Sequence, residues 1–239
     1  MTQKRKNGNG NGNFNGYEGN EKKPPTKNPI NIVAKSQNQK LLLTSIRENT
    51  VTIVAGPPGT GKTLISVACG LREFIMGHYK KMIFTRPCVE ANGENLGFLP
   101  GDLHEKISPY MYPIFDFLAD FLTSQKIEYY IKSGEFLTLP LAFMRGTTFR
   151  NAFVLLDEAQ NTKPEQIRMF LTRIGEGCKV VITGDPHQSD VKGLNGLVDA
   201  VERLKGVTSL GIVRFNKEDI VRHPIVSEIE SRYEEKEKG

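Results

Sequence analysis

The amino-acid sequence predicts an α/β fold, in which one central parallel sheet is flanked by helices on both faces. The first observation is that short apolar runs of strand length alternate along the chain with segments of helical periodicity. Such alternation requires parallel strands, because each helix carries the chain back to the same end of the sheet. The second observation is that 239 residues, 38% apolar and 25% charged, fit one compact domain with tails. Ligands of such sheets bind at the C-terminal ends of the strands.

The first predicted strand is the β-branched run 51–55, bounded by glycine, and helical periodicity over 62–76 follows it. Further strands, recognised as short apolar runs, are predicted at 82–85, 153–157, 179–183 and 207–215. Further helices are predicted at 164–174, 194–204 and 217–234. Pro164 then lies in a first helical turn, where its missing N–H costs nothing.

Residues 86–150 interrupt this alternation and are interpreted as an insertion at the ligand-binding edge of the sheet. Gly and Pro recur over 93–101, an aromatic helix-like stretch covers 110–122, and 128–131 continues the helical pattern. The closely spaced aromatic residues of the second stretch, which suit base stacking, are Tyr110, Tyr112, Phe115 and Phe117. The residues at helical spacing, which favour a buried or subunit-facing stripe instead, are Phe115, Leu118, Ala119 and Leu122.

The two ends of the chain are predicted to lie outside the domain, which is expected to span 29–233. Residues 1–28 are rich in Asn and Gly and hold too little apolar surface to offset the entropy of ordering, so we expect disorder. Six Lys or Arg against two Glu give this tail +4 of the formal net charge of +5, so the folded part has no global basic field that would indicate nucleic acid. The basic tail either tethers RNA or DNA weakly or only solubilises the chain. Residues 234–239 are typical of a fraying, charged helix end.

Composition excludes several other classes of protein. Three widely spaced cysteines, Cys69, Cys88 and Cys178, indicate neither a disulfide framework nor a metal knuckle, and the isolated histidines give no reason to expect zinc. No apolar run approaches membrane-spanning length, and no apolar core follows the N-terminal positive charge, so we expect neither a membrane protein nor a secreted one. These features favour a reduced, cytoplasmic protein.

The sequence GPPGTGKT fits the G-x-x-x-x-G-K-[ST] pattern of a phosphate-binding loop. Its residues are Gly56, Pro57, Pro58, Gly59, Thr60, Gly61, Lys62 and Thr63. The motif follows a predicted strand and opens a predicted helix, so its N–H groups and the helix N-terminus would surround phosphate oxygens with donors. In such a loop Lys62 reaches the β and γ phosphates, and Thr63 gives a hydroxyl to the metal. The motif therefore predicts ATP and Mg²⁺ as cofactors.

The segment 154–160, VLLDEAQ, places two adjacent carboxylates at the tip of a predicted strand. Asp157 is predicted to hold the magnesium shell, and Glu158 to polarise the attacking water as a general base. The alternative is an acidic pair that caps a helix. Since the strand 82–85 lies between this motif and the phosphate loop, the chain groups with ATPases that have an extra strand and a catalytic Glu, rather than with nucleotide kinases.

The segment 181–190, VITGDPHQSD, is again a predicted strand followed by a turn. Asp185 and Gln188 are predicted to sense the γ-phosphate or to orient water, which would couple hydrolysis to movement. Gly-Asp-Pro is also an ordinary turn sequence, but its position after DEAQ favours the catalytic role.

Seven stretches of the chain resemble the PhoH family, ATP-binding proteins named for phosphate-starvation induction and related to superfamily-one helicases. They are GPPGTGKT (56–63), TRP (85–87), GENLGFLPGDLHEKISPY (93–110), FMRGTTFRNAFVLLDEAQNT (143–162), MFLTRIGEG (169–177), ITGDPHQSD (182–190) and VRHPIVSEI (221–229). The resemblance implies a single RecA-like P-loop NTPase domain associated with RNA or single-stranded nucleic acid. It also implies a homo-oligomer, often described as a hexameric ring, with nucleotide near a subunit interface. Gln39, in SQNQK, matches the adenine-reading glutamine of the family, the alternative being an exposed polar residue.

The chain departs from parts of that family pattern. Some relatives carry a PIN nuclease domain, and nothing here is long enough to be one, so ribonuclease activity is not expected. Superfamily-one helicases have two RecA-like domains and this chain has one, so translocation would need neighbouring subunits. The short form resembles proteins of bacteriophages, for which the host cytoplasm is the expected location.

Phosphoryl transfer also needs a positive charge at the transition state. The candidate arginine fingers inside the family stretches are Arg145, Arg173 and Arg222. Arg222 would stand opposite the phosphate of a neighbouring subunit, and salt bridges between helices are the alternative for each candidate. Arg86, in TRP, is interpreted either as a contact to a nucleic-acid backbone or as the partner of a carboxylate in the insertion.

These observations predict an ATPase that hydrolyses ATP with Mg²⁺. Hydrolysis is expected to be coupled to binding or remodelling of RNA or single-stranded nucleic acid, and an oligomer could act as an RNA helicase. The alternative is a nucleotide-dependent oligomeric switch or assembly factor with negligible hydrolysis, against which Glu158 and Gln188 argue. A third hypothesis is a plain RNA-binding module in which the N-terminal tail makes the contacts.

Overall fold

The computed structural model describes residues 30–87, 103–221, 225–226, 228–229 and 232. Its centre is a six-stranded sheet in the order β3-β2-β4-β5-β1-β6, with every neighbouring pair parallel. The strands are β1 (Val51–Ala55), β2 (Lys81–Thr85), β3 (Phe136–Thr138), β4 (Ala152–Leu156), β5 (Lys179–Gly184) and β6 (Leu210–Arg214). The helices are α1 (Gln37–Glu48), α2 (Lys62–Ile75), α3 (Leu103–Ala119), α4 (Ser124–Lys132), α5 (Pro164–Leu171) and α6 (Gly196–Arg203). The predicted α/β fold with a central parallel sheet is confirmed.

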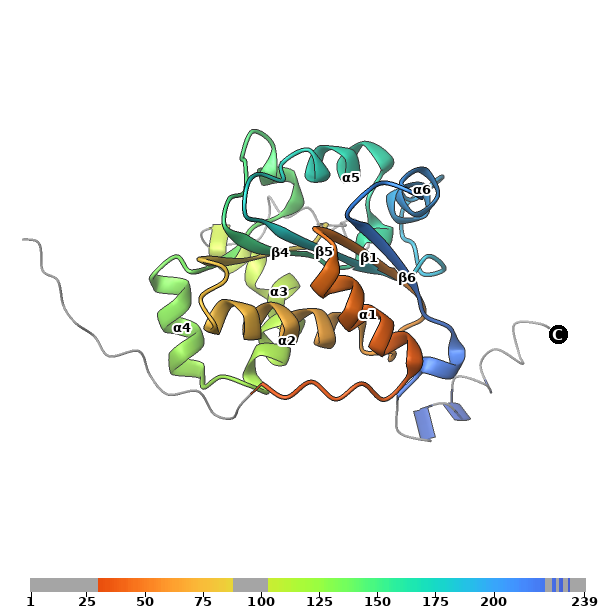
Figure 1. Cartoon of the computed structure of the whole chain (residues 1–239), viewed down its shortest axis with the longest axis horizontal. Helices are drawn as coiled ribbons and strands as arrows, with labels where there is room; N and C mark the ends of the chain where they lie inside the picture. Colours follow the sequence, from red (N-terminus) through yellow and green to blue (C-terminus); the bar gives the residue numbers. More distant parts are fainter. Residues whose placement is uncertain (1–29, 88–102, 222–224, 227, 230–231, 233–239) are drawn as a thin grey trace, which may run out of the picture.

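Helices cover both faces of the sheet. Figure 1 shows α5 and α6 on one face and α1, α2, α3 and α4 on the other. Alternate residues of β4 supply the two cores, because successive side chains of a strand point to opposite faces: Phe153 packs in the cluster under α1 and α2, and Val154 in the cluster under α5 and α6. The sheet is therefore buried on both sides, as its near-continuous apolar strands predict.

The five strands predicted from apolar runs are confirmed, each within about three residues of its predicted ends. The strand that stands between β1 and β4 in the sheet is β5, whereas β2, the strand predicted at 82–85 between the two motifs, lies on the other side of β4. Helix α5 ends at Leu171 rather than at 174, because the chain there turns to pair Phe149 with residues 173 and 174.

The region 86–150 extends the sheet, a feature that the interpretation as an insertion missed. Strand β3 pairs with β2 at the sheet edge, and Phe136 anchors it, with ring centroids 4.7 Å from Tyr130 and 5.3 Å from Phe74. Of the predicted stripe, Leu118 on α3 and Leu122 just after it are buried, and Phe115 and Ala119 are partly buried against the same core. Residues 93–101 lie outside the described residues, as do the predicted tails 1–28 and 234–239.

The predicted helix over 217–234 is wrong at its start. Lys217–Asp219 form a single 3₁₀ turn, and Ile220 is extended. The turn closes because the side chains of Asn216 and Asp219 each accept a backbone N–H of the same turn, which is the local competition with helix that Asn and Asp offer. Of the helices that the structure describes, none is both long and apolar enough to cross a membrane.

Candidate nucleotide-binding site

The phosphate-binding loop joins β1 to α2 at the C-terminal edge of the sheet. Gly59 and Gly61 adopt φ values of 77° and 82°, a left-handed conformation that glycine reaches without steric cost. Gly56 lies so close to Phe215 that a Cβ there would come within 2.6 Å of the Phe215 Cβ. The N-terminus of α2, which begins at Lys62, faces the loop, and a helix N-terminus presents N–H donors to an anion.

Lys62 lies inside this loop and is 8% exposed. Its ammonium donates to the carbonyls of Gly56 and Pro57 at 2.8 and 2.7 Å and approaches the hydroxyl of Thr60 at 3.4 Å. These contacts hold the ammonium at the centre of the loop. Phosphate oxygens are stronger partners than carbonyls for an ammonium, because the bond is then between two charged groups.

Asp157 is the centre of the polar network beside the loop and is 2% exposed. Its Oδ1 accepts the hydroxyls of Thr63, at 2.9 Å, and of Thr183. Its Oδ2 accepts both Nε and Nη2 of Arg86, with Nε at 3.0 Å. Arg86 thus pairs with the carboxylate of the acidic motif, a partner that sequence reasoning did not name for it.

The oxygens of Thr63 and Asp157 form a donor set that suits Mg²⁺. Mg²⁺ is usually held by one or two carboxylates together with substrate phosphates, and these two oxygen donors meet at the mouth of the phosphate loop. Among the described residues no group of three or more His, Cys, Asp or Glu side chains forms a metal cage. A metal held jointly with phosphates needs no such cage, so the residues present fit the predicted ion.

Glu158 follows Asp157 in a left-handed backbone conformation, with φ 57°. This conformation is unfavourable for a residue with a side chain and occurs at functional sites when surrounding contacts enforce it. The exposed carboxylate accepts a hydrogen bond from the side-chain Nε2 of Gln160 at 2.6 Å, and the side-chain Oε1 of Gln160 accepts the backbone N–H of Asp185 at 3.0 Å. Gln160 thus links the carboxylate of Glu158 to the turn that begins at Asp185.

Sequence reasoning assigned no role to Gln160 or Thr183, although both stand inside quoted motifs. Gln160 is 3% exposed, and a Cβ on Gly184 would come within 2.5 Å of its Oε1, so glycine is required there for the link to form. Both residues could have been noticed in the sequence as polar side chains near the C-terminal end of a predicted strand. The sequence does not indicate which of these polar side chains form hydrogen bonds with one another.

A cavity of about 440 Å³ joins the three predicted motifs. The residues that line it come from the loop, from β2 and α3, from the two acidic turns and from the C-terminal segment: Pro58, Gly59, Gly61, Lys62, Thr63, Leu64, Arg86, Pro113, Phe117, Asp157, Glu158, Gly184, Asp185, Gln188 and Val221. Asp185 is buried and accepts the backbone N–H of His187 at 3.0 Å, whereas Gln188 is exposed. The parallel strands therefore bring Gly59, Gly61, Lys62 and Thr63 of the loop together with Asp157, Glu158, Asp185 and Gln188 in one hollow, whereas Gly56, Pro57, Thr60 and Gln39 do not line it.

Gln39 lies against the loop rather than in solvent, so the exposed alternative is wrong. It is 4% exposed, and its amide donates to the carbonyl of Thr60 at 3.0 Å while its Oε1 accepts Lys35 N–H at 2.6 Å. If Gln39 contacted adenine, its side chain would have to replace these two hydrogen bonds with bonds to the base. Sequence reasoning also missed Val221, whose N–H donates to Gly59 O at 2.9 Å and so ties the segment after β6 to the loop.

Neither of the two candidate arginine fingers that the structure describes completes this cavity. Arg145 is exposed, and Arg173 donates to Met169 O and to the Thr172 hydroxyl. Neither lines the cavity, and Arg222 lies outside the described residues.

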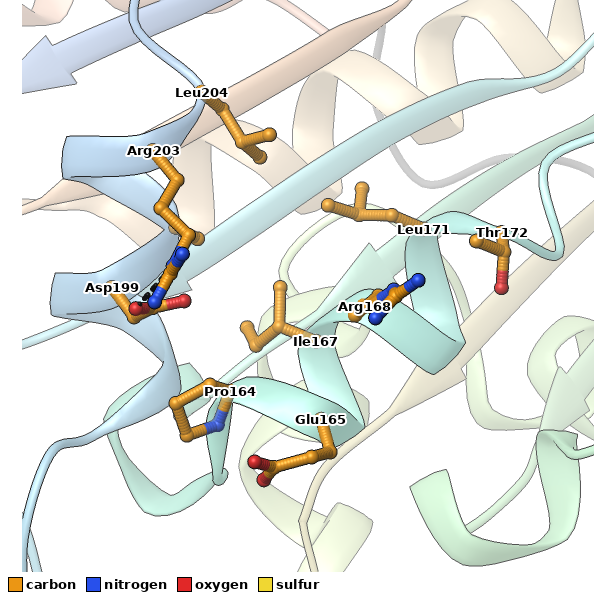
Figure 2. A pocket seen from close by; sticks show the side chains of 10 residues that line it. Pro164, Glu165, Ile167, Arg168, Leu171, Thr172, Asp199, Arg203 and Leu204 are labelled. Carbon is orange, nitrogen blue, oxygen red and sulfur yellow. Dashed lines mark hydrogen bonds and ion pairs between the residues drawn. The ribbon is translucent and has the colours of Figure 1, made fainter.

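A further cavity of about 570 Å³ lies between α5 and α6 (Figure 2). Its lining is Pro164, Glu165, Ile167, Arg168, Leu171, Thr172, Asp199, Ala200, Arg203 and Leu204. It contains none of the predicted site residues.

Residues 31–234 match the family described as PhoH-like protein. The chain belongs to the PhoH-like family. It is 45% identical over 205 residues to the PhoH-like protein of Bacillus subtilis (strain 168), covering 85% of this chain and 64% of that one. It is 43% identical over 195 residues to Protein PhoH of Escherichia coli (strain K12), covering 80% of this chain and 55% of that one. The chain thus spans 55–64% of the length of these two relatives.

Solved structures with some likeness to this PhoH-like chain have low sequence identity. The large terminase from a thermophilic bacteriophage gives a TM-score of 0.48 at 15% identity, covering 82% of this chain and 50% of that one. Pif1 helicase from Candida albicans gives a TM-score of 0.38 at 14% identity, covering 77% of this chain and 41% of that one. PhoH-like family membership, the strand order and the phosphate loop together make this a RecA-like P-loop domain.

Proposed function

We propose that this PhoH-like domain binds ATP with Mg²⁺ and hydrolyses it. The observation that carries the proposal is the Thr63–Asp157 contact of 2.9 Å at the mouth of the phosphate loop, with the carboxylate of Glu158 on the wall of the same cavity. Phosphoryl transfer needs little covalent chemistry from the protein, so positioning and charge stabilisation supply most of the rate. The loop lysine, the two metal donors and the carboxylate proposed to activate water all line this one hollow.

Each residue has a distinct role in the proposed reaction. The loop N–H groups and Lys62 hold the β and γ phosphates and stabilise the charge that develops on their oxygens. Bound magnesium would neutralise phosphate charge beside Thr63 and Asp157. Glu158 orients and polarises the attacking water, and Gln160 keeps that carboxylate facing the turn of Asp185 and Gln188. This turn then senses whether the γ-phosphate is present.

We further propose that RNA or single-stranded nucleic acid is the partner, and that the working form is a cytoplasmic homo-oligomer. The family's relation to helicases supports the first part, and the basic residues 1–28 offer charge for a phosphate backbone. The homo-oligomer is supported by two observations: Arg145 is exposed, and neither Arg145 nor Arg173 lines the cavity. An arginine supplied by a neighbouring subunit, with Arg222 as the first candidate, would complete the transition-state charge.

The test is phosphate release from ATP, measured with and without RNA and single-stranded DNA, together with mass measurement in the presence of nucleotide. We expect Lys62→Ala to lose nucleotide binding, and Glu158→Gln to bind ATP while releasing no phosphate. Glu165→Gln, at an exposed glutamate of α5 outside this cavity, is the matched control and should turn over like the wild type. Full turnover by Glu158→Gln would overturn the assignment, whereas nucleotide-dependent assembly without turnover in the wild type would support the switch instead.

A further inference from the structure

Arg86 and Asp157 form a largely buried ion pair inside the nucleotide cavity. Arg86 directly follows β2 and Asp157 directly follows β4, the neighbouring strand, and Asp157 N–H donates to Thr85 O at 3.0 Å. The two side chains are 13% and 3% exposed. Parallel pairing of the two strands thus fixes a guanidinium beside the carboxylate that the proposed function assigns to magnesium.

The two oxygens of Asp157 have different partners. Oδ1 accepts the hydroxyls of Thr63 and Thr183, whereas Oδ2 is held by Nε and Nη2 of Arg86. A buried carboxylate without a cation is strongly unfavourable, so the fold needs a positive charge here in the absence of metal. Arg86 supplies it from a position that also lines the cavity.

We propose that Arg86 occupies the cation position next to Asp157 until Mg²⁺ arrives with nucleotide, and that the two cations compete for this carboxylate. The proposal rests on the proposed function, because it takes Mg²⁺·ATP as the ligand. A dication and a guanidinium on one carboxylate repel each other across a few ångströms of low-dielectric interior. Metal binding therefore loosens Arg86 from Asp157, and the polyphosphate that arrives with the metal is an anion that this cavity-lining guanidinium can bind in a bidentate manner.

The exchange makes nucleotide binding more dependent on magnesium than the metal donors alone require. Part of the free energy of metal binding goes into displacing Arg86. Without Arg86, the empty position next to Asp157 attracts Mg²⁺ even when nucleotide is absent. These two consequences separate a competing cation from an arginine that only stabilises the fold.

The first measurement is binding of a fluorescent ATP analogue at increasing Mg²⁺ concentration. We expect Arg86→Ala to lower the Mg²⁺ concentration for half-maximal binding about tenfold. This is the change expected when the fraction of molecules whose Asp157 can accept Mg²⁺ rises from about a tenth to nearly one. Arg86→Lys, which keeps the charge but loses the bidentate fork, should fall between the two. Arg47→Ala removes an exposed arginine that pairs with Glu48 on α1 and should match the wild type.

The second measurement is thermal unfolding without nucleotide. Mg²⁺ alone should raise the midpoint of Arg86→Ala and leave the wild type unchanged. Equal or higher Mg²⁺ requirements in Arg86→Ala and Arg86→Lys, with normal nucleotide binding by the wild type, would overturn the competition but leave the proposed function standing. Failure of the wild type to bind nucleotide at saturating Mg²⁺ would instead overturn the proposed function. If Arg86→Ala does not fold, Arg86→Lys alone decides between these outcomes.

Discussion

The cavity at the phosphate loop and the cavity between α5 and α6 differ more in what lines them than in size. The cavity between α5 and α6 is the larger, at about 570 Å³ against about 440 Å³ for the cavity at the phosphate loop. At the larger one, Arg203 pairs with Asp199, four residues before it on the same helix. At the phosphate loop, Lys62 and Asp157 are almost fully buried. Burial of polar groups, and not volume, marks the site.

The origin of the partners explains this difference. Asp157 receives Thr63 from 94 residues away and Arg86 from 71 residues away, whereas the Asp199–Arg203 pair would form on an isolated helix. A buried charge is unfavourable unless such partners meet it. Here the partners of Asp157 come from distant parts of the chain and surround an open cavity. The stability of the core alone does not require such a polar arrangement.

The largest expected contrast is between two aspartates, one from each cavity. Asp157→Asn removes the anion that Nε and Nη2 of Arg86 contact and leaves this mostly buried guanidinium facing a neutral amide, so we expect the free energy of unfolding to fall by about 3 kcal/mol. Asp199→Asn breaks a pair whose arginine is 73% exposed and should leave unfolding unchanged. Urea unfolding of the nucleotide-free proteins measures both. Equal losses would erase the distinction between the two cavities.

Two glutamines allow the next comparison. Gln160→Ala frees Glu158 from its link to Asp185, and we expect the turnover number to fall about ten- to a hundredfold with little change in nucleotide affinity, as for other residues that orient a reacting group. Gln166→Ala removes a side chain that accepts Lys163 N–H at the start of α5. That variant should lose some stability and keep its turnover. Steady-state kinetics that found Gln160→Ala unimpaired would show that the link is only structural.

The sequence predicted the parts of the site whose spacing is local. The loop from Gly56 to Thr63 and the pair Asp157–Glu158 are read directly, because phosphate binding requires these residue types in contiguous order after a strand. The pairing of Arg86 with Asp157 could not be read in this way. It depends on β2 lying next to β4, and the alternation of strands and helices does not fix strand order.

Where the predictions failed, distant contacts overrode a local pattern. Strand β3 has three residues, too few for any periodicity, and aromatic packing around Phe136 is what holds it. The sequence SQNQK is polar, yet Gln39 is buried by a contact to Thr60, 21 residues later. The helical pattern from Lys217 fails at Asp219, which bonds to Asn38, 181 residues earlier.

Asp219 provides the third prediction, because it joins the segment after β6 to α1 beside the phosphate loop. Burial raises the pKa of its carboxyl, but hydrogen bonds from Asn38, Ser36 and Asn216 N–H outweigh burial and hold the pKa below the ordinary 3.8. The folded state therefore favours the carboxylate, and this stability is full above pH 3.8 and is lost as pH falls through the folded pKa. We expect Asp219→Asn to lower the free energy of unfolding by about 1.5 kcal/mol at neutral pH.

Denaturant unfolding between neutral pH and pH 3 measures this effect. The difference between Asp219→Asn and the wild type should shrink as the solution is acidified below the ordinary pKa. A difference that stayed constant with pH would mean that the charge of Asp219 plays no part in holding the segment.

The smallest expected effects come from two buried threonines near the C-terminal ends of β2 and β5, the two strands that flank β4. Thr183 donates to the carboxylate of Asp157, while Thr85 Oγ1 is the buried side-chain polar atom that finds no partner among the described residues. Threonine and valine have nearly the same shape, so each substitution tests a hydroxyl alone. Thr183→Val should lower the free energy of unfolding by about 1 kcal/mol, and Thr85→Val should leave it unchanged or raise it by up to about 1 kcal/mol, because an unsatisfied hydroxyl is then removed. If both substitutions lowered the free energy of unfolding equally in chemical denaturation, both hydroxyls would be hydrogen-bonded. The polar network around Asp157 would then include Thr85 at the end of β2.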